Sequence, residues 1–188
     1  MNLELFEKRY TQARVKSDVL TSDGKGVEFS KYPLDILKDS ALAQDEQDFL
    51  HRIGLPQAAA PYLNFENLYE KIPGLAEFFD ESFCLGFASR KRLIAADKAT
   101  GELQCLELGD KGVDILLVNS SLEKFVECLC LFEECIDKTK LHECYQAMCQ
   151  ADSALVEEDN FWQEETEGFM DNVLNALNAL ANKSRQSG

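Results

Sequence analysis

The sequence predicts an α+β fold in which a series of strands precedes a packed helix, with further helices on either side. Strand-length apolar runs, each broken by a turn signal, occupy residues 83–118. Directly after Asn119-Ser120-Ser121 the apolar residues recur every three or four positions, which is typical of an amphipathic helix. This regular part carries no catalytic constellation, and we expect it to be a scaffold.

The composition predicts a folded cytoplasmic protein. The chain has 188 residues, of which 45% are hydrophobic, so we expect one domain with a substantial core rather than disorder. Its apolar runs are much shorter than the roughly 20 residues that a transmembrane helix needs. Residues 1–16 are charged throughout and lack the apolar segment of a secretory signal.

The seven cysteines predict reduced, mostly buried thiols. An odd number cannot pair completely within one chain, and no C-x-x-C is present. The alternative is a zinc site, although the spacing of its candidate ligands matches no zinc pattern: Cys135, His142, Cys144 and Cys149. We therefore expect no metal and no cofactor.

Apolar side chains at helical spacing predict a first helix over residues 2–16 and a second over Ser40–Ile53. Four residues share one face in each helix: Leu3, Phe6, Tyr10 and Ala13 in the first, and Leu42, Phe49, Leu50 and Ile53 in the second. Gly54 supplies the left-handed residue that ends the second helix, and Pro56 prevents its continuation.

Four strands are predicted in the middle of the chain, at Phe83–Ala88, Arg92–Ala96, Leu103–Leu108 and Val113–Val118. Gly101 lies in a hairpin-type loop and is suited to positive φ. The last run is nearly continuously apolar, which predicts a central strand that is covered on both faces.

Three helices are predicted after the strands. Ser120 is the expected N-cap of the first, and Glu123 completes its capping box. The other two are expected at Leu141–Ala151 and at about Asn160–Ala181. Phe161, Trp162 and Phe169 in the last helix are either an exposed binding hot spot or, as their helical spacing favours, part of its packing face.

No catalytic motif is visible. The sequence contains no G-x-S-x-G, P-loop, G-x-G-x-x-G or H-E-x-x-H. His51, late in one predicted helix, and His142, early in another, are expected to be structural. The carboxylates fall mostly on polar helix faces, where burial does not prepare them for acid–base catalysis. We expect a protein that is not an enzyme; an enzyme without a recognisable motif is the alternative.

The chain is strongly acidic, with 19 Lys and Arg against 34 Asp and Glu and a net charge of −15. Residues 122–171 hold 14 of the acidic and 3 of the basic side chains, which places −11 of this charge there. Such a field repels nucleic acid and anionic membranes and attracts basic partners. The alternative is a solvated surface that only keeps the protein soluble. We expect the compact basic run Arg90-Lys91-Arg92 to counterbalance nearby acids in a turn.

Several short motifs follow one another in a fixed order. They are Gly54-Leu55-Pro56 after a helix, Leu85-Gly86 in a strand, a turn from Asp97 to Thr100-Gly101, Val118-Asn119-Ser120-Ser121-Leu122 with Phe125 in the next helix, and a last helix with Trp162. In this order, over roughly residues 35–180, the chain resembles the SUKH superfamily, and most of all its branch of bacterial toxin-immunity proteins (SUKH-4-like).

The resemblance implies a mixed, mainly antiparallel, curved sheet packed by N-terminal and C-terminal helices. It assigns residues 32–182 to the SUKH-like domain, with a helix and turn at 1–31 before it and a frayed tail at 183–188 after it. No catalytic residue is carried over. The matching residues are expected to form turns and caps: Gly54, Pro56, Gly86, Gly101, Asn119 and Ser120.

The resemblance also implies an immunity protein that binds and neutralises a cognate polymorphic toxin domain, such as a nuclease or a nucleic-acid deaminase, by stoichiometric inhibition. An interaction or regulatory module without a toxin partner is the alternative. The acidic surface suits a toxin with a basic substrate groove, and we expect a monomer or weak dimer. The residues expected to contact the toxin are Glu157, Glu158, Asp159, Trp162, Glu164, Glu165 and Glu167.

Overall fold

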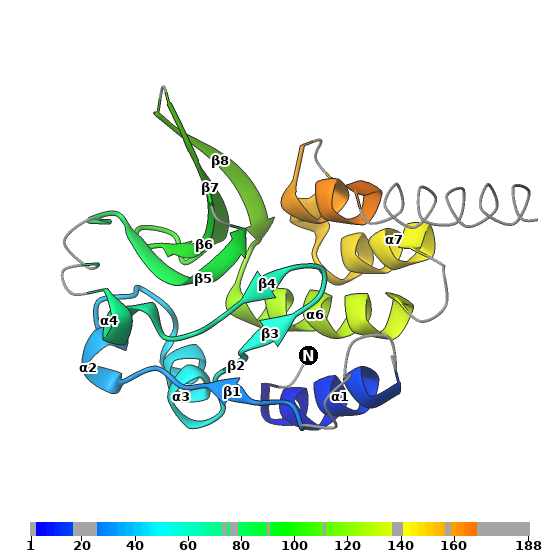
Figure 1. Cartoon of the computed structure of the whole chain (residues 1–188), viewed down its shortest axis with the longest axis horizontal. Coiled ribbons are helices and arrows are strands. Elements are labelled where there is room, and N and C mark those ends of the chain that lie inside the picture. Colours follow the sequence, from blue (N-terminus) through cyan, green and yellow to red (C-terminus); the bar gives the residue numbers. More distant parts are fainter. Residues whose placement is uncertain are drawn as a thin grey trace, which may run out of the picture.

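The computed structural model of the protein describes residues 3–16, 26–72, 75, 79–89, 91–110, 112–136, 141–156 and 159–168. An antiparallel sheet lies beside a layer of helices, and a two-stranded sheet joins the N-terminal part to it (Figure 1). This arrangement confirms the predicted α+β class.

The strands of the larger sheet follow one another in chain order and pair antiparallel throughout. They are β3 (Ala58–Ala59), β4 (Leu63–Asn64), β5 (Ser82–Ser89), β6 (Arg92–Asp97), β7 (Leu103–Gly109) and β8 (Gly112–Asn119). The smaller sheet pairs β1 (Phe29–Ser30) with β2 (Leu55–Pro56).

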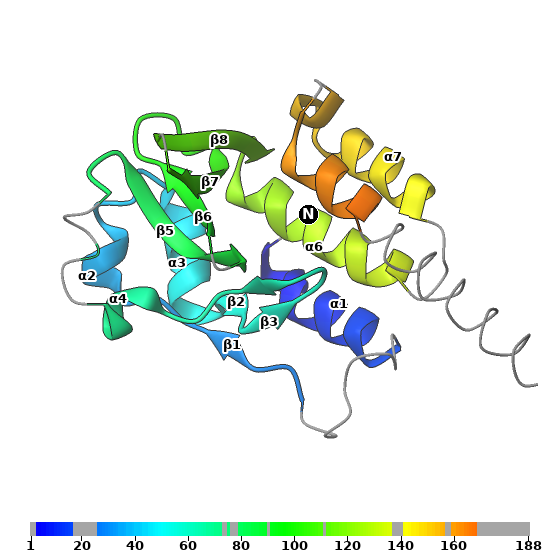
Figure 2. The ribbon, with the colours of Figure 1, turned by 45° about the horizontal axis from the view of Figure 1, so that its top comes forward.

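Some helices lie along one side of the sheet, and others lie beside the first strands of the chain (Figure 2). They are α1 (Leu3–Lys16), α2 (Leu34–Leu37), α3 (Gln44–Arg52), α4 (Leu68–Lys71), α6 (Leu122–Ile136) and α7 (Leu141–Ala151), with a 3-10 helix at Ser153–Val156. Residues 161–168 are also helical, and the rest of the predicted last helix lies outside the described residues.

The main core lies between the sheet and α6, which packs between α1 and α7. Leu122, Phe125 and Leu129 are buried on the predicted apolar face of α6. A second, smaller apolar cluster covers part of the other sheet face, where Leu93 and Leu106 contact residues around α4. Because side chains alternate between the two faces of a strand, the sheet contributes residues to both apolar clusters.

The prediction that Val113–Val118 forms a central strand is wrong. β8 is the last strand of the sheet, and the side chains of Val113 and Ile115 are 49% and 59% exposed. Only its C-terminal end, at Val118 and Asn119, is fully buried. A continuous apolar run is compatible with a central strand, but it is equally compatible with an edge strand that displays its apolar residues.

Two glycines allow close backbone approach around the N-terminal sheet. Gly54 ends the helical segment after α3 with a φ of 84°, and a Cβ there would lie 1.9 Å from the carbonyl oxygen of Ser30. A Cβ on Gly86 would lie 2.3 Å from the carbonyl oxygen of Asn64. Both positions therefore require glycine, and Gly101 adopts the predicted positive φ, at 78°.

α1 is fixed to α6 by a buried carboxylate. Glu133, which is 1% exposed, accepts hydrogen bonds from the Tyr10 hydroxyl (2.9 Å), the Arg14 guanidinium (2.8 Å) and the Ala60 amide (3.2 Å). A buried charge of this kind needs several donors to offset its lost hydration. The N-terminal helix is thus part of the main packed body.

The N-cap predicted at Ser120 is wrong, because α6 begins at Leu122 and Ser121 Oγ accepts the Lys124 amide at 3.3 Å. The buried carboxylate of Glu46 supplies a second, distant cap. It accepts the Leu122 amide (3.0 Å) and, through its other oxygen, the Ala43 amide at the start of α3 (3.1 Å). Burial raises the pKa of Glu46, although these N–H groups oppose the shift. One side chain therefore joins the N-termini of two helices.

All seven cysteines are free thiols, and five are fully buried. Burial raises the pKa to about 12 at four of them: Cys84, Cys105, Cys128 and Cys130. Within the described residues, no cluster of three or more His, Cys, Asp or Glu could hold a metal ion, and no helix is long and apolar enough to cross a membrane.

We expect Glu46→Ala to lower the free energy of unfolding by about 2–3 kcal/mol, because buried N–H donors lose their acceptor. Glu46→Gln keeps one acceptor oxygen and should cost roughly half as much. Urea unfolding measures both changes, with Asp48→Ala at an exposed position of the same helix as the control. Equal stability of the Glu46→Ala and Asp48→Ala variants would contradict the shared cap.

Candidate partner-binding surface

The two histidines lie apart. His51 Nδ1 is 3.1 Å from the carbonyl oxygen of Tyr32, and the exposed His142 contacts Gln146. Among the described residues, neither histidine is hydrogen-bonded to a nucleophilic side chain.

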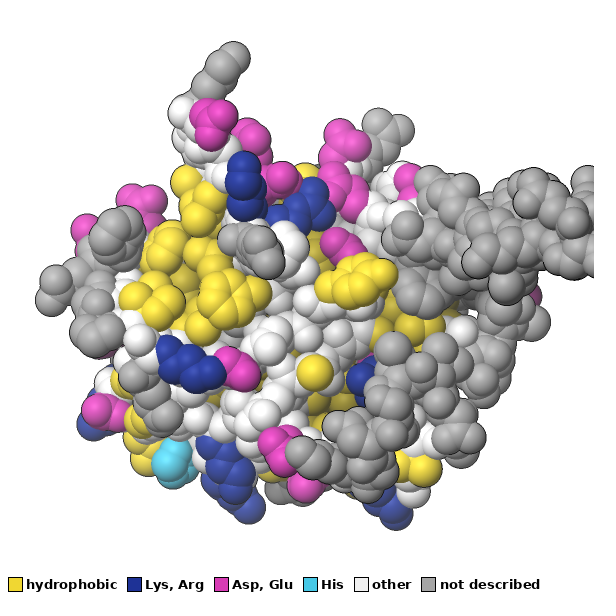
Figure 3. All heavy atoms as spheres, in the orientation of Figure 1, with side chains coloured by type: hydrophobic (Ala, Val, Ile, Leu, Met, Phe, Trp, Pro, Cys, Tyr) yellow, Lys and Arg dark blue, Asp and Glu magenta, His cyan; other side chains and the backbone are white. Residues whose placement is uncertain are grey.

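The predicted contact residues lie in and before the helical residues 161–168. Asp159 is exposed before this helix, which carries Glu164, Glu165 and Glu167. Glu157 and Glu158 lie outside the described residues. Figure 3 shows carboxylates gathered together with a few basic side chains along the upper side of the molecule.

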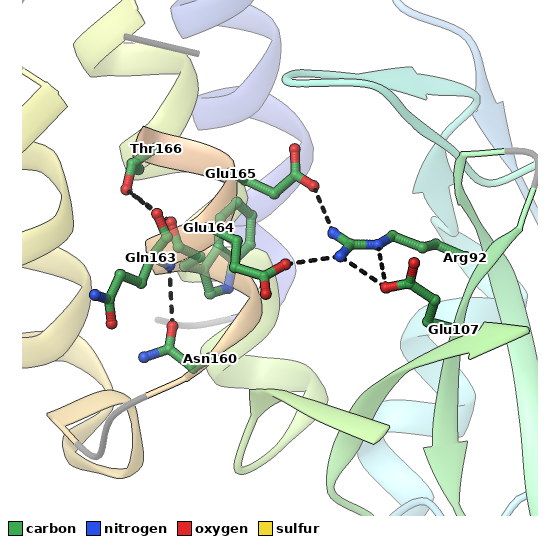
Figure 4. Close-up of polar contacts among 8 residues, drawn as sticks. Arg92, Glu107, Asn160, Gln163, Glu164, Glu165 and Thr166 are labelled. Atoms are coloured by element: carbon green, nitrogen blue, oxygen red, sulfur yellow. Dashed lines mark hydrogen bonds and ion pairs between the residues drawn. The ribbon is translucent and has the colours of Figure 1, made fainter. Parts of the chain in front are cut away.

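Arg92, at the start of β6, lies among three carboxylates (Figure 4). Its Nη2 atom lies 2.8 Å from Glu107 Oε2 on β7 and 2.8 Å from Glu164 Oε2, while its Nη1 atom lies 3.4 Å from Glu165 Oε1. One cation cannot balance three anions, so the cluster keeps an excess negative charge. The basic turn therefore counterbalances acids at Arg92, as predicted, and joins the sheet to the acidic helix.

The environment of this cluster shifts the titration of two of its members. Burial opposes the charge of Arg92, but its hydrogen bonds to Glu107 and Glu164 outweigh burial and raise its pKa. Burial also raises the pKa of Glu165, against the attraction of Arg92. Because Glu165 is the most enclosed carboxylate, Glu107 and Glu164 present more of their charge to solvent.

Trp162 is fully buried, so the structure supports the packing interpretation of this aromatic residue rather than an exposed hot spot. Its indole packs against Phe125, Phe132 and Phe161, with ring centroids 6.1, 5.9 and 5.3 Å away. Its Nε1–H donates to Asn119 Oδ1 at 2.9 Å. In this arrangement Trp162 holds the acidic helix and cannot itself touch a partner.

Asn119 connects Trp162 to a buried carboxylate. Its Nδ2 group donates to Asp152 Oδ2 at 3.0 Å, and the same carboxylate accepts the amide of Ser120 (2.8 Å) and its hydroxyl (2.9 Å). Burial works against the charge of Asp152, but these hydrogen bonds outweigh it, so the pKa of Asp152 is lowered. Ser120 is thus part of a polar network between β8 and the segment after α7.

Asn160, directly before the helical residues 161–168, orients this acidic helix as its N-cap. Its Oδ1 atom accepts the Gln163 amide at 3.1 Å, which is an N-cap hydrogen bond, and its Nδ2 group donates to Tyr145 Oη at 2.7 Å. One turn after Trp162 on the same inner face, Thr166 Oγ1 donates to the Trp162 carbonyl oxygen. The inner face of the helix is therefore fixed, while Glu164 and Glu167 lie on its exposed face.

The structure brings two predicted contact residues, Glu164 and Glu165, together with Arg92 and Glu107. Sequence reasoning did not identify Glu107 or the anchoring Asp152. The alternation of the third strand places Glu107 on the same face as Cys105, but nothing local in the sequence pairs that strand with a helix more than 50 residues away.

Comparison with known proteins identifies a family. The family model described as SUKH-4 immunity protein matches residues 35–172. No curated protein and no solved structure matches the chain.

We expect Asp152→Asn to lower the free energy of unfolding at pH 7 by about 2–3 kcal/mol, because an amide accepts fewer of these hydrogen bonds. The folded pKa of Asp152 lies below its unfolded value of about 3.9, so its contribution is present above that pH and is lost as the pH falls through the folded pKa. Urea unfolding at pH 7 and at pH 3 measures this difference.

The exposed Asp159→Asn is the matched control and should change stability by less than about 0.5 kcal/mol at both pH values. A deficit in Asp152→Asn that is as large at pH 3 as at pH 7 would contradict the ionised role of Asp152.

Proposed function

The chain belongs to the SUKH-4 immunity protein family, and from this membership we propose that it binds and neutralises a cognate toxin domain. It acts stoichiometrically and without catalysis, in the cytoplasm of the cell that it protects, as a monomer or weak dimer. The family match over residues 35–172 is the observation that carries this proposal.

Electrostatics supports a partner with a basic surface. The chain has a net charge of −15. Arg92 balances only part of the combined negative charge of Glu107 and Glu164. Complementary charge accelerates encounter and selects against wrong partners. A toxin that acts on nucleic acid, such as a nuclease or a deaminase, needs a basic substrate groove, so an acidic protein can compete for that groove.

The rigid presentation of the acidic helix also favours binding. Trp162 and Asn160 hold its inner face through buried hydrogen bonds to Asn119 and to the Leu155 carbonyl oxygen. Side chains on a pre-organised helix lose less conformational entropy when a partner binds than side chains on a mobile loop. A regulatory module without a toxin partner remains the competing function, and it predicts no protection of cells.

Co-expression with the toxin-domain protein encoded next to its gene separates these functions. We expect the two proteins to co-purify in a 1:1 ratio and the toxin to lose its toxicity. A toxin that kills equally well with and without this chain, and does not co-purify with it, would leave the regulatory function as the better account.

We expect charge reversal at Glu157, Glu158 and Glu167 to slow toxin association about tenfold at low salt and to flatten the salt dependence of the rate. Glu164 and Glu165, which pair with Arg92, are left unchanged, so these ion pairs are retained. Lys substitutions at Glu7, Asp35 and Asp48 change the net charge equally at exposed sites elsewhere and are the control. Stopped-flow mixing measures the association rate of each triple variant. Equal rates would show that Glu157, Glu158 and Glu167 form only a solvated surface.

A further inference from the structure

The β7–β8 hairpin projects from the body of the molecule, with β8 at its outer edge (Figure 1). Near the end of β8, Leu117 forms a parallel bridge to Asn160. Among the residues that the structure describes, no strand pairs with the outer edge at 112–116. In Figure 3 the hairpin and the segment after α7 rise on two sides of a hollow.

The hydrogen bonds on the inner side of β7 fix the direction of its backbone groups. Leu108 N lies 2.9 Å from the carbonyl oxygen of Lys91, and Asp97 N lies 2.9 Å from the carbonyl oxygen of Glu102. Both hydrogen bonds show that the backbone N–H and C=O groups of the even-numbered residues in and next to β7 point toward β6. Because backbone groups alternate along a strand, the odd-numbered residues of β7 face β8.

This alternation decides which groups of β8 are open. Glu107 pairs with Asp114, so Asp114 exchanges its hydrogen bonds with β7. Val113 and Ile115, one position to each side, direct their N–H and C=O groups away from β7. Such a row of open donors and acceptors can pair with another strand.

The hairpin is apolar on one face. Ile115 pairs with Leu106 of the smaller core, and Val113 pairs with Leu108, so these four side chains share a face. Leu106 is buried, while Leu108, Val113 and Ile115 are 40%, 49% and 59% exposed. An added strand would extend this apolar face and cover it.

The other face of the hairpin is acidic. Glu107 and the exposed Asp114 are directly opposite each other across the strands, and Glu107 belongs to the cluster around Arg92 with Glu164. Asp110 is exposed at the hairpin turn. A strand beside β8 would therefore meet apolar side chains on one face and carboxylates on the other.

Charge selects the occupant of this edge. Antiparallel pairing with a second copy would bring two chains of net charge −15 together and would place Asp114 close to its own counterpart. Like charges opposite each other destabilise strand pairing. A basic segment of another protein gains from the same carboxylates.

We propose that the toxin adds an extended segment to the outer edge of β8, in which apolar residues alternate with Lys or Arg. This inference rests on the proposed immunity function and assigns it a surface. The apolar residues cover Val113 and Ile115, the basic residues approach Asp114 and Glu107, and the backbone groups of Val113 and Ile115 complete the ladder.

Residue-resolved amide exchange by NMR, with the toxin-domain protein encoded next to the gene as the probe, tests the proposal. In the free protein, the amides of Asp114 and Leu116 should exchange slowly and those of Val113 and Ile115 rapidly. Toxin binding should slow exchange at Val113 and Ile115 at least tenfold. A general stiffening of the hairpin would slow exchange at all of these amides and not selectively at Val113 and Ile115.

Paired substitutions give a second readout. Val113→Lys with Ile115→Lys should weaken toxin binding at least tenfold, while Leu5→Lys with Val15→Lys, which changes exposed apolar residues of α1 by the same charge, should not. The emission of the buried Trp162 reports that both variants are folded.

The outcomes separate the two proposals. Toxin binding without protection at Val113 and Ile115, or with unchanged affinity in the β8 variant, overturns the edge assignment and leaves the immunity function standing. No binding by the unmodified protein overturns both. Protection that appears without toxin and rises with protein concentration assigns the edge to a second copy and overturns the basic partner.

Discussion

The buried hydrogen bonds among Asn119, Asp152 and Trp162 are the interaction on which the C-terminal half depends. Asn119 stands at the junction of β8 and α6, and its one amide group contacts both the carboxylate after α7 and the indole of the acidic helix. A buried amide that lost either partner would leave a polar group unsatisfied in a low-dielectric interior. The segment after α7 therefore has one favourable position against the sheet, and the acidic surface has one geometry.

The acids of this protein divide into two physical classes. Glu46, Glu133 and Asp152 are buried, and each is surrounded by donors that it joins across elements distant in sequence. Glu164 and Glu107 are partly exposed around Arg92, where solvent screens their attraction and leaves a negative field outside. The same residue type thus joins distant elements where it is buried and gives the surface a negative field where it is exposed.

Sequence patterning predicted much of the fold because periodicity and turn residues are local signals. The stop at Gly54, the four long strands and α6 follow from spacing alone, and the family resemblance is confirmed by the match over residues 35–172. The edge position of β8 and the cap from Glu46 depend on contacts between distant segments, which no local pattern specifies. For the same reason the carboxylates near Trp162 could be identified, but their ion pairs with Arg92 could not.

The helix at 161–168 separates what stabilises the protein from what faces outward. Trp162 and Thr166 point inward, while Glu164 and Glu167 are exposed, and exposed substitutions usually change stability by less than about 0.5 kcal/mol. Substitution of Glu167 should therefore change stability little, whereas Glu164 also pairs with Arg92. Under the proposed immunity function, a framework of this kind would give the lineage evolvability, because the buried residues can stay constant while exposed ones such as Glu167 diverge.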